Sequence, residues 1–314
     1  MNYNRILQLI EEYDTITVFR HQRPDCDASG SQFGLKQWII DNYPEKKVYA
    51  LGTETSFQGR FPALDSVENE VIRSSLAVVV DTNTPDRVDD QRFSMAAHVL
   101  KIDHHPDLYP YADDNEVNDK AAAVCEILAE FMKSAEDKTV SKETAEYLYQ
   151  GLLTDTLCFM TSNTTPSSLM AAAYLARTGI NIPEINRYLF DVSLEEYAFA
   201  NFIRSGVKII DNKLAYFILS LEDQEKWGIN GSEARNFIGE LGHVKEFEIW
   251  AMFTAKDNDG MTVYDGSLRS KTVPVNTVAQ FYGGGGHRCA AGVKNLTDEK
   301  LRQILPDLLS LLNK

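Results

Sequence analysis

The chain has 314 residues, of which 44% are hydrophobic and 25% are charged, an ordinary balance for a globular protein of two domains. Its formal net charge of −15 excludes a broad basic face for long DNA or RNA, although a small phosphorylated ligand or divalent metal ions remain compatible with it. The sequence contains no apolar run as long as a membrane span, and its four scattered cysteines form no CxxC pair. We therefore expect no structural zinc site, no disulfide framework and a cytoplasmic location.

The first half of the sequence alternates short β-branched segments with helical ones. An amphipathic helix is expected at the N-terminus, in "MNYNRILQLIEEYD". Nearly continuous apolar runs predict strands at 15–19, 46–51, 76–82 and 97–103. Helices are expected at 28–42, more weakly at 64–74, and then at 119–133, 141–157 and 167–178. This order predicts a doubly wound α/β domain with a mainly parallel sheet over residues 1–190.

The pattern changes after about residue 190. A helical segment at 191–205 is expected to link the two domains. Residues 207–220 predict a hairpin that turns at Asp211-Asn212, and residues 246–270 predict two longer strands that turn at Asp259-Gly260. With a final amphipathic helix at 297–313, these elements predict a smaller α+β domain at 206–314, across a cleft from the first.

Acidic and imidazole side chains follow three of the four strands predicted in the first half. The carboxyl ends of parallel strands meet at one edge of a sheet, near the point where the strand order reverses. One aspartate there is more often a solvated loop residue, but several strands that deliver such groups to one edge favour a site. The candidates are His21, Asp25, Asp27, Asp81, Asp103, His104 and His105.

Asp155 adds a carboxylate at the C-terminal end of a predicted helix, where the helix dipole disfavours it. Such an acid usually has a cationic partner, either a metal ion or a neighbouring lysine or arginine. The candidates contain imidazole and carboxylate but no thiolate, a donor set that suits two divalent cations sharing a carboxylate, and Mn²⁺ tolerates mixed nitrogen and oxygen ligands. Two such cations, about 3.5–4 Å apart, can activate water for an in-line phosphoryl displacement.

Four consecutive glycines, Gly283 to Gly286, precede His287 and Arg288. Backbone N–H groups of glycines can approach a phosphate closely, although a flexible turn is the alternative explanation. Arg269 and Ser270, in the segment "SLRS", favour ligand binding because an arginine can hold a phosphate with two hydrogen bonds.

The sequence "DHH" at 103–105, with "HQRPDCDASGS", "VVVDT" and "LLTDT", resembles the DHH phosphoesterase superfamily. The segments "GSLRSK" and "GGGGHRCAAG" resemble its DHH-associated C-terminal domain, so the resemblance covers nearly the whole chain. Within the superfamily, the chain resembles the small bifunctional oligoribonucleases that also dephosphorylate 3′-phosphoadenosine 5′-phosphate (pAp), which are also labelled exopolyphosphatase-related.

The resemblance implies one metal site of His21, Asp25 and Asp81 and a second of Asp27, Asp81, His104 and Asp155, bridged by Asp81. It implies that His105 faces the substrate phosphate or the leaving group and that Asp103 orients the histidines. The expected substrate-binding residues are Arg269, Ser270, Gly284, Gly285, Gly286 and His287. Leu157 and Met160 depart from the pattern, since relatives often carry glycine and a basic residue in that segment.

We therefore expect hydrolysis of short oligoribonucleotides (dinucleotides, nanoRNA) or of pAp, with two Mn²⁺ ions, or Mg²⁺ or Co²⁺ as substitutes. A pyrophosphatase, a short-chain exopolyphosphatase or a phosphodiesterase for cyclic or linear dinucleotides would use the same centre. A nucleotide sensor with a degenerate site is the non-enzymatic alternative. The expected partners are a short RNA or nucleotide and a second copy of the chain, with no long nucleic acid and no membrane.

Overall fold

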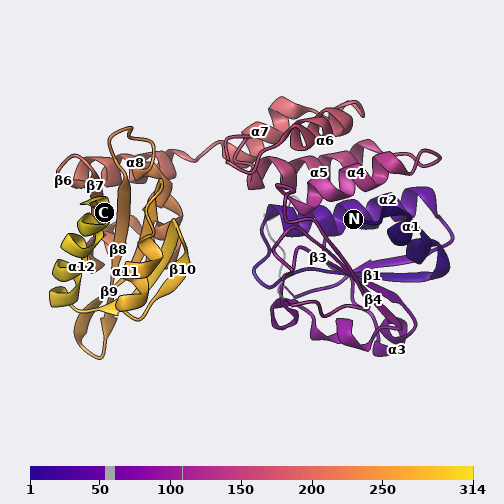
Figure 1. The fold of residues 1–314 in the computed structure, drawn as a ribbon, viewed down its shortest axis with the longest axis horizontal. Coiled ribbons are helices and arrows are strands. Elements are labelled where there is room, and N and C mark those ends of the chain that lie inside the picture. Colours follow the sequence, from indigo (N-terminus) through magenta and orange to yellow (C-terminus); the bar gives the residue numbers. More distant parts are fainter. Residues whose placement is uncertain (54–60, 108, 314) are drawn as a thin grey trace. The chain divides into compact units, whose positions relative to one another are not determined.

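The computed structural model describes residues 1–53, 61–107 and 109–313, and the chain divides into two compact units, Met1–Asp191 and Val192–Lys314 (Figure 1). Each unit contains its own β-sheet. Among the described residues, no helix is both long enough and apolar enough to cross a membrane.

The first unit is built on a parallel five-stranded sheet in the order β2-β1-β3-β4-β5. The four predicted strands are present, which confirms the parallel sheet, whereas β5 was missed because its sequence, DNEV, is polar and only half-buried. The strands are β1 (Thr15–Phe19), β2 (Lys47–Ala50), β3 (Leu76–Val80), β4 (His98–Asp103) and β5 (Asp114–Val117).

Helices cover both faces of this sheet, as the doubly wound prediction requires. Leu100 and Ile102 of β4 pack in one core with α1, α2, α4 and α5, whereas Val99 packs in another core with Ile72 of α3. Accordingly, α3 lies opposite the larger helical layer in Figure 1. The weak helix expected at 64–74 contracts to α3, and α7 was not predicted. The helices are α1 (Tyr3–Glu12), α2 (Cys26–Asn42), α3 (Asn69–Arg73), α4 (Val124–Ser134), α5 (Lys142–Asp155), α6 (Pro166–Ala176) and α7 (Ile182–Phe190).

Two glycines allow α2 and α5 to pack with their backbones in close contact. A Cβ atom on Gly30 would lie 2.5 Å from the carbonyl oxygen of Tyr147, and one on Gly151 would lie 2.8 Å from the Cα of Asp27. Both distances are too short for any side chain larger than hydrogen. This packing brings the first turn of α2, which carries Asp27, close to the end of α5.

The second unit contains a mixed six-stranded sheet in the order β10-β11-β9-β8-β7-β6, in which only the β7–β8 pair is parallel among the described strands. Both predicted hairpins are present, with left-handed backbone at Asp211-Asn212 and at Asp259-Gly260. The strands are β6 (Lys208–Ile210), β7 (Leu214–Leu219), β8 (Ile249–Asn258), β9 (Met261–Ser270), β10 (Gly285–His287) and β11 (Ala290–Leu296).

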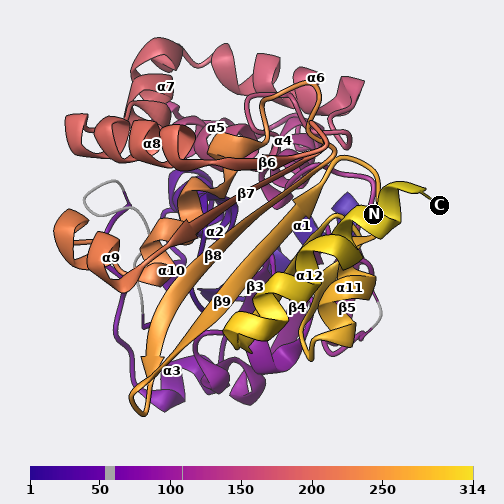
Figure 2. The same cartoon turned by 90° about the vertical axis from the view of Figure 1, so that its left-hand side faces the viewer.

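Helices lie on both faces of the second sheet (Figure 2). α11 and α12 share a core with Phe253 of β8, while α8 and the 3₁₀ helix share another with Met252. α8 covers most of the segment expected to link the domains, and its Phe199 and Ile203 belong to this second core. The helices α9, α10 and α11 were not predicted. The helices are α8 (Leu194–Gly206), α9 (Leu221–Trp227), α10 (Gly231–Ala234), the 3₁₀ helix Arg235–Leu241, α11 (Val275–Phe281) and α12 (Asp298–Ser310).

Candidate metal centre

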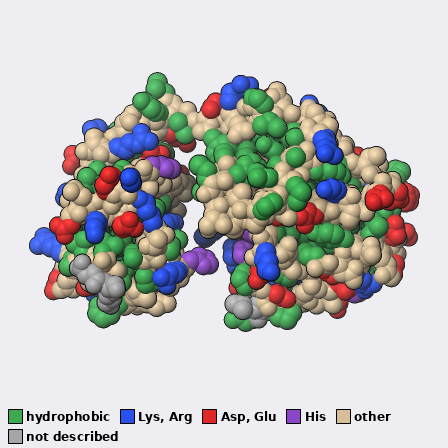
Figure 3. All heavy atoms as spheres, turned by 45° about the horizontal axis from the view of Figure 1, so that its top comes forward, with side chains coloured by type: hydrophobic (Ala, Val, Ile, Leu, Met, Phe, Trp, Pro, Cys, Tyr) green, Lys and Arg blue, Asp and Glu red, His purple; other side chains and the backbone are tan. Residues whose placement is uncertain are grey.

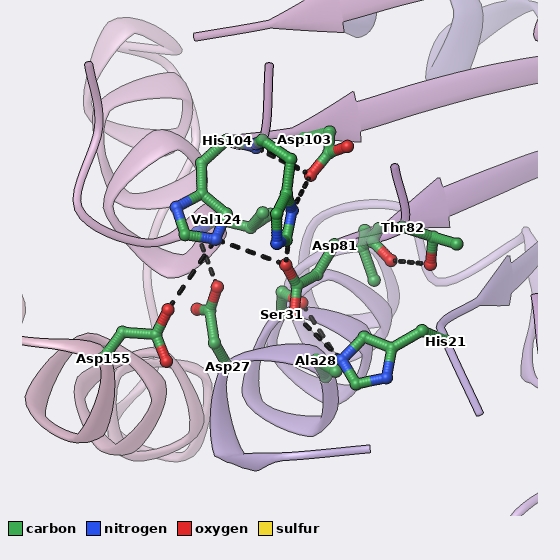
Figure 4. Close-up of polar contacts among 12 residues, drawn as sticks. His21, Asp27, Ala28, Ser31, Asp81, Thr82, Asp103, His104, Val124 and Asp155 are labelled. Carbon is green, nitrogen blue, oxygen red and sulfur yellow. Dashed lines mark hydrogen bonds and ion pairs between the residues drawn. The ribbon is translucent and has the colours of Figure 1, made fainter. Parts of the chain in front are cut away.

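The predicted acidic and imidazole residues of the first unit converge at the carboxyl edge of its sheet (Figure 4). His21 follows β1, Asp81 follows β3 directly, and Asp103 is the last residue of β4. β2 lies on one side of β1 and β3 on the other, so the strand order reverses between β1 and β3. The loops that leave these two strands therefore open onto the same crevice.

Asp81 lies at the centre of the cluster. Its Oδ2 is 3.4 Å from Nε2 of His21, and its Oδ1 is 3.4 Å from Nε2 of His104. The carboxylate is almost fully buried, and Oδ1 has no hydrogen-bond partner in the described parts of the chain. The backbone of Asp81 has a φ of 50°, an uncommon conformation that tends to occur at functional sites. The buried carboxylate of Asp81 thus lies between the imidazole nitrogens of His21 and His104, and its Oδ1 accepts no hydrogen bond from the described residues.

His21, Asp25 and Asp81 form the first group of potential metal ligands. Nδ1 of His21 donates to the carbonyl oxygen of Gln22 at 2.8 Å in the tautomer that leaves Nε2 free to bind a cation. Asp25 is the N-cap of α2 and accepts from the N–H of Ala28 through Oδ1, while its Oδ2 lies 3.7 Å from Nε2 of His21. The helix cap therefore fixes Asp25 with one oxygen directed at the histidine.

Asp27, His104 and Asp155 form the second group. Asp27 is fully buried and accepts from the N–H groups of Val124 and Cys125 at 2.7 and 2.9 Å, which caps α4 where its own N-cap residue has no capping side chain. Nε2 of His104 lies 3.7 Å from Oδ2 of Asp155, the last residue of α5. The acid that the helix dipole disfavours is thus directed at a histidine, and Figure 4 shows it beside Asp27.

The crowding of carboxylates makes the cluster retain protons. Burial raises the pKa of Asp27, and the charge of Asp81 raises it further. Burial also raises the pKa of Asp155, together with the charges of Asp27 and Asp81. Burial opposes the charged form of His21, but hydrogen bonds to Asp25 and Asp81 outweigh it and raise the pKa of His21 to about 10. A cation at the cluster would replace these protons and relieve the repulsion.

The donor set fits divalent metal ions. Four carboxylates and three imidazoles converge, because Asp81, His104 and His105 form a further group that joins the other two. The buried Oδ1 of Asp81 has no hydrogen-bond partner among the described residues. Hard divalent ions prefer oxygen, and first-row transition ions also accept imidazole. Both groups contain the residues that the resemblance implies, with Asp81 lying against each.

Asp103 lies behind the two histidines and is fully buried. Its Oδ1 accepts from the backbone N–H groups of His104 and His105 at 2.8 and 3.2 Å, and from Nδ1 of His105 at 2.8 Å. That hydrogen bond leaves Nε2 of the half-exposed His105 free. Lys101, which the sequence analysis overlooked, has its Nζ 3.4 Å from Oδ2 of Asp103. The detectable signal was a lysine within the otherwise apolar run VLKI, just before Asp103.

The segment after Asp155 has an unusual backbone. Leu157, Cys158 and Phe159 all have positive φ values, of 44°, 58° and 66°. The hydroxyl of the buried Thr156 accepts from the N–H of Phe159 and helps to hold this turn. The turn leaves Leu157 56% exposed. Left-handed backbone favours glycine, so a leucine there is strained.

Arg269 in the second unit lies on β9, half-buried, and donates to the carbonyl oxygen of Leu268 at 2.9 Å. Burial lowers the pKa of its guanidinium, and no ion pair joins it to a carboxylate of the described residues. The neighbouring Ser270 donates instead to the carbonyl oxygen of Val273 at 2.6 Å, within its own turn. Arg269 therefore retains donors for an anion, whereas the hydroxyl of Ser270 is already engaged.

The glycine run is largely an edge strand and not an irregular loop. Gly285 to His287 form β10, which pairs with β11. A Cβ on Gly284 would lie 2.1 Å from the carbonyl oxygen of Gly292, and Gly286 has a φ of 139°. The close approach to β11 thus requires glycine at 284, and the backbone conformation favours it at 286; contact of these glycines with a phosphate stays a prediction. Gly285 and His287 are exposed, and a Cβ on Gly285 would meet no described atom within 4 Å.

Comparisons with known proteins identify the family of the chain. Residues 15–152 match the DHH family, N-terminal domain, and residues 211–314 match the DHHA1 domain. The chain belongs to the DHH family of phosphoesterases, which confirms the resemblance.

Relatives match the chain over its full length. It is 34% identical over 308 residues to the bifunctional oligoribonuclease and PAP phosphatase NrnA of Bacillus subtilis, a match that covers 98% of this chain and 97% of that protein. It is 32% identical over 310 residues to the probable bifunctional oligoribonuclease and PAP phosphatase NrnA of Streptococcus mutans, covering 99% of each. The crystal structure of an exopolyphosphatase-related protein from Bacteroides fragilis shares the fold, with a TM-score of 0.83, 23% identity, and coverage of 100% of this chain and 98% of that one.

Proposed function

We propose that this chain is a metal-dependent phosphoesterase that hydrolyses short oligoribonucleotides, including dinucleotides, and the 3′-phosphate of pAp. The observation that carries the proposal is the position of Asp81, a buried carboxylate in contact range of both His21 and His104. The full-length relatives that carry both activities in their names support this choice of substrates.

Two cations would be held by the two groups of ligands, one by His21 and Asp25 and the other by Asp27, His104 and Asp155, with Asp81 shared. When bound, such ions activate water and withdraw negative charge from a phosphoryl group. We propose Mn²⁺, because each group mixes carboxylate oxygens with an imidazole nitrogen, and we expect Mg²⁺ or Co²⁺ to substitute with lower activity.

The chain's own residues supply orientation and proton transfer. His105 is the candidate general acid: Asp103 accepts the hydrogen bond of its Nδ1–H, and the imidazolium form would give its second proton, on Nε2, to the leaving oxygen and remain as the neutral Nδ1–H tautomer. Arg269 is the candidate partner for a phosphate of the substrate, because its guanidinium is half-buried without a carboxylate among the described residues. His287 and Gly285, exposed on β10, are weaker candidates for the same role.

The preferred substrates should be short. The net charge of −15 opposes a long polyanion, because each added phosphate gains repulsion where no cation meets it. On the face drawn in Figure 3, the coloured lysine and arginine side chains are interspersed with acidic ones and form no continuous stripe, which supports this proposal. The homodimer and the cytoplasmic location stay predictions of the sequence.

The test is a substrate panel with the full-length protein and Mn²⁺. It would contain pAp, a dinucleotide, 5′-labelled RNAs of increasing length, pyrophosphate and a short polyphosphate. We expect kcat/KM to be highest for pAp and the shortest RNAs and to fall with length. Turnover confined to pyrophosphate or polyphosphate would contradict the proposal, and nucleotide binding without any turnover would instead support a sensor.

A further inference from the structure

Lys101 is a fully buried lysine in the middle of β4. Its Nζ lies 3.1 Å from Oδ1 of Asp107 and 3.4 Å from Oδ2 of Asp103, and 5.2 Å from the centre of the Tyr111 ring. On the same face of the strand, Val99 packs in an apolar core. A buried ammonium is costly unless it is paired, so its two carboxylates and the aromatic ring keep it there.

Packing alone does not require a lysine at this position. Replacing a buried ion pair by apolar residues of similar volume is often neutral or stabilising. The structure instead shows what the ammonium does for Asp103. Oδ1 of Asp103 accepts three N–H groups of the two histidines, whereas its Oδ2 is buried and has no hydrogen-bond partner among the described residues. Lys101 is the cation that faces that oxygen.

The orientation of His105 depends on this arrangement. Nδ1 of His105 lies 2.8 Å from Oδ1 of Asp103 but also 3.6 Å from Oδ1 of Asp81. The two carboxylates therefore compete for one ring nitrogen. If Asp103 turns away, His105 can pair with Asp81, which lies against both ligand groups, and its Nε2 is no longer held toward the substrate.

We propose that Lys101 is a positioning residue: it fixes Asp103 as the hydrogen-bond acceptor of Nδ1 of His105, so that His105 presents Nε2 to the leaving group. The inference rests on the proposed function, in which His105 is the general acid. Lys101 also anchors the segment after the histidines through Asp107. Tyr111, whose ring it faces, donates to the carbonyl oxygen of Thr82 at 2.8 Å, next to Asp81. The lysine therefore connects the backbone on both sides of the centre.

The kinetic test is a double-mutant cycle of Lys101→Met and His105→Ala in the full chain, with Mn²⁺ and pAp. Methionine keeps the length and the apolar stem of lysine but removes the charge. We expect K101M to lower kcat by about 10- to 100-fold with little change in KM, the usual effect of losing such a support. In the His105→Ala background the same change should alter kcat by less than about twofold, because residues that act through one another are not additive.

The matched control is Lys36→Met. Lys36 lies on α2, and its Nζ is 2.5 Å from Oδ2 of Asp65, so this variant also breaks a lysine–aspartate pair but should leave kcat unchanged. Thermal unfolding and Mn²⁺ titration of each variant separate catalysis from folding and metal binding. An equal loss of kcat in both backgrounds, or wild-type kcat in K101M, would overturn the inference.

A second readout does not depend on activity. Histidine-selective ¹⁵N NMR of the Mg²⁺-loaded protein, assigned with the His105→Ala variant, reports the tautomer of His105. We expect a proton on Nδ1 in the wild type and a mixture of tautomers in K101M. The same tautomer in both proteins would contradict the inference. If wild-type protein turns over no nucleotide, the proposed function fails, and the NMR result still decides the role of Lys101.

Discussion

The two units present their candidate functional residues in different ways. In the first unit, the potential ligands stand at the ends of buried strands and helices, and most are held by hydrogen bonds to the backbone, as Asp27 is by α4 and His21 by the carbonyl of Gln22. In the second unit, Gly285 and His287 are exposed on an edge strand. The candidate metal ligands are therefore held in place before any ligand binds, whereas the exposed residues of β10 are not held by comparable contacts.

The candidate residues of the two units also differ in charge. The first has more carboxylates than cationic groups and retains protons, as the raised pKa values of Asp27 and Asp155 indicate. The second has Arg269, whose pKa burial lowers and which pairs with no carboxylate in the described parts of the chain. The first site has carboxylates whose repulsion a cation would relieve, and Arg269 in the second unit retains donors for an anion. The two sets of residues can be changed separately, and each change should affect a different step.

Removal of metal should have the largest effect. Chelation with EDTA is expected to abolish hydrolysis, and Mn²⁺ should restore it far better than Ca²⁺. Calcium prefers roughly six to eight oxygen ligands. The two ligand groups include His21 and His104, whose imidazole nitrogens suit Mn²⁺ better than Ca²⁺. The measurement is the initial rate on pAp after dialysis and addition of each metal. Equal restoration by calcium would argue against these ligands.

Replacing Asp81 with Asn should have the second largest effect on activity, because Asp81 is the carboxylate that lies against both ligand groups. Loss of one electrostatic contact in an active site typically lowers kcat by up to about 10³-fold, and we expect a larger fall here. The variant should still fold, because the side chain of Asp81 pairs with histidines of the candidate centre, and because removing its charge relieves the carboxylate repulsion in the metal-free protein. Circular dichroism and kinetics on pAp are the measurements.

The matched control for this variant is Asp86→Asn, which alters an exposed aspartate on a short 3₁₀ helix just beyond the centre. It should retain wild-type activity. Near wild-type turnover by the Asp81→Asn protein would exclude a centre that depends on this carboxylate.

Replacing Arg269 with Met should have a smaller effect, of a different kind. Loss of one charge-assisted phosphate contact, worth about 1.5–3 kcal/mol, should raise KM for pAp by about 10- to 100-fold. Metal affinity should not change, because the groups of potential ligands found among the described residues lie in the first unit. The exposed Arg302→Met on α12 is the control. Unaltered KM in the Arg269 variant would remove this residue from substrate binding.

The smallest expected effect is on the pH dependence of stability without metal. Asp27 and Asp155 have raised pKa values in the folded chain, so the folded state holds protons that the unfolded chain has released. The protonated carboxyls add to the free energy of unfolding. This stabilisation is fully present below pH 3.8, the ordinary aspartate pKa, and is lost as the pH rises toward about 9, the pKa of Asp155. The melting temperature of the metal-free protein should therefore fall by roughly 5 °C between about pH 5 and about pH 9.

Saturating Mn²⁺ should reduce this fall, because bound cations keep the carboxylates ionised, and Asp155→Asn should reduce it without metal. Differential scanning fluorimetry over the pH range is sufficient. A metal-free melting temperature that rises with pH would contradict the crowding of carboxylates described for the first unit.

Much of the first unit could be predicted from the sequence because its signals are local. Buried parallel strands such as LAVVV are apolar without interruption, and the residue that follows each one lies at the same edge of the sheet. Placing Asp81 beside His21 and His104 required only that rule. The distances, and the capping of α4 by Asp27, depend on the close packing of α2 against α5 and could not be obtained from the pattern.

The second unit was less predictable because its elements depend on distant partners. Glycines 283–286 read as a loop by composition, but Gly285 and Gly286 pair with Gly292 and Ala291 in β11. α11 has only seven residues, too few for a clear helical period. Lys101 was missed for a related reason. Its importance comes from the contact of its Nζ with Oδ2 of Asp103, and the order of charged residues along the sequence does not show that contact.

The most direct test of the central claim is a crystal structure of the Mn²⁺-loaded protein with anomalous diffraction measured at the manganese absorption edge. We expect two anomalous peaks, one bound by His21, Asp25 and Asp81, and the other by Asp27, His104 and Asp155, with Asp81 reaching both. A single peak, or two peaks that do not share Asp81, would contradict the two-cation centre.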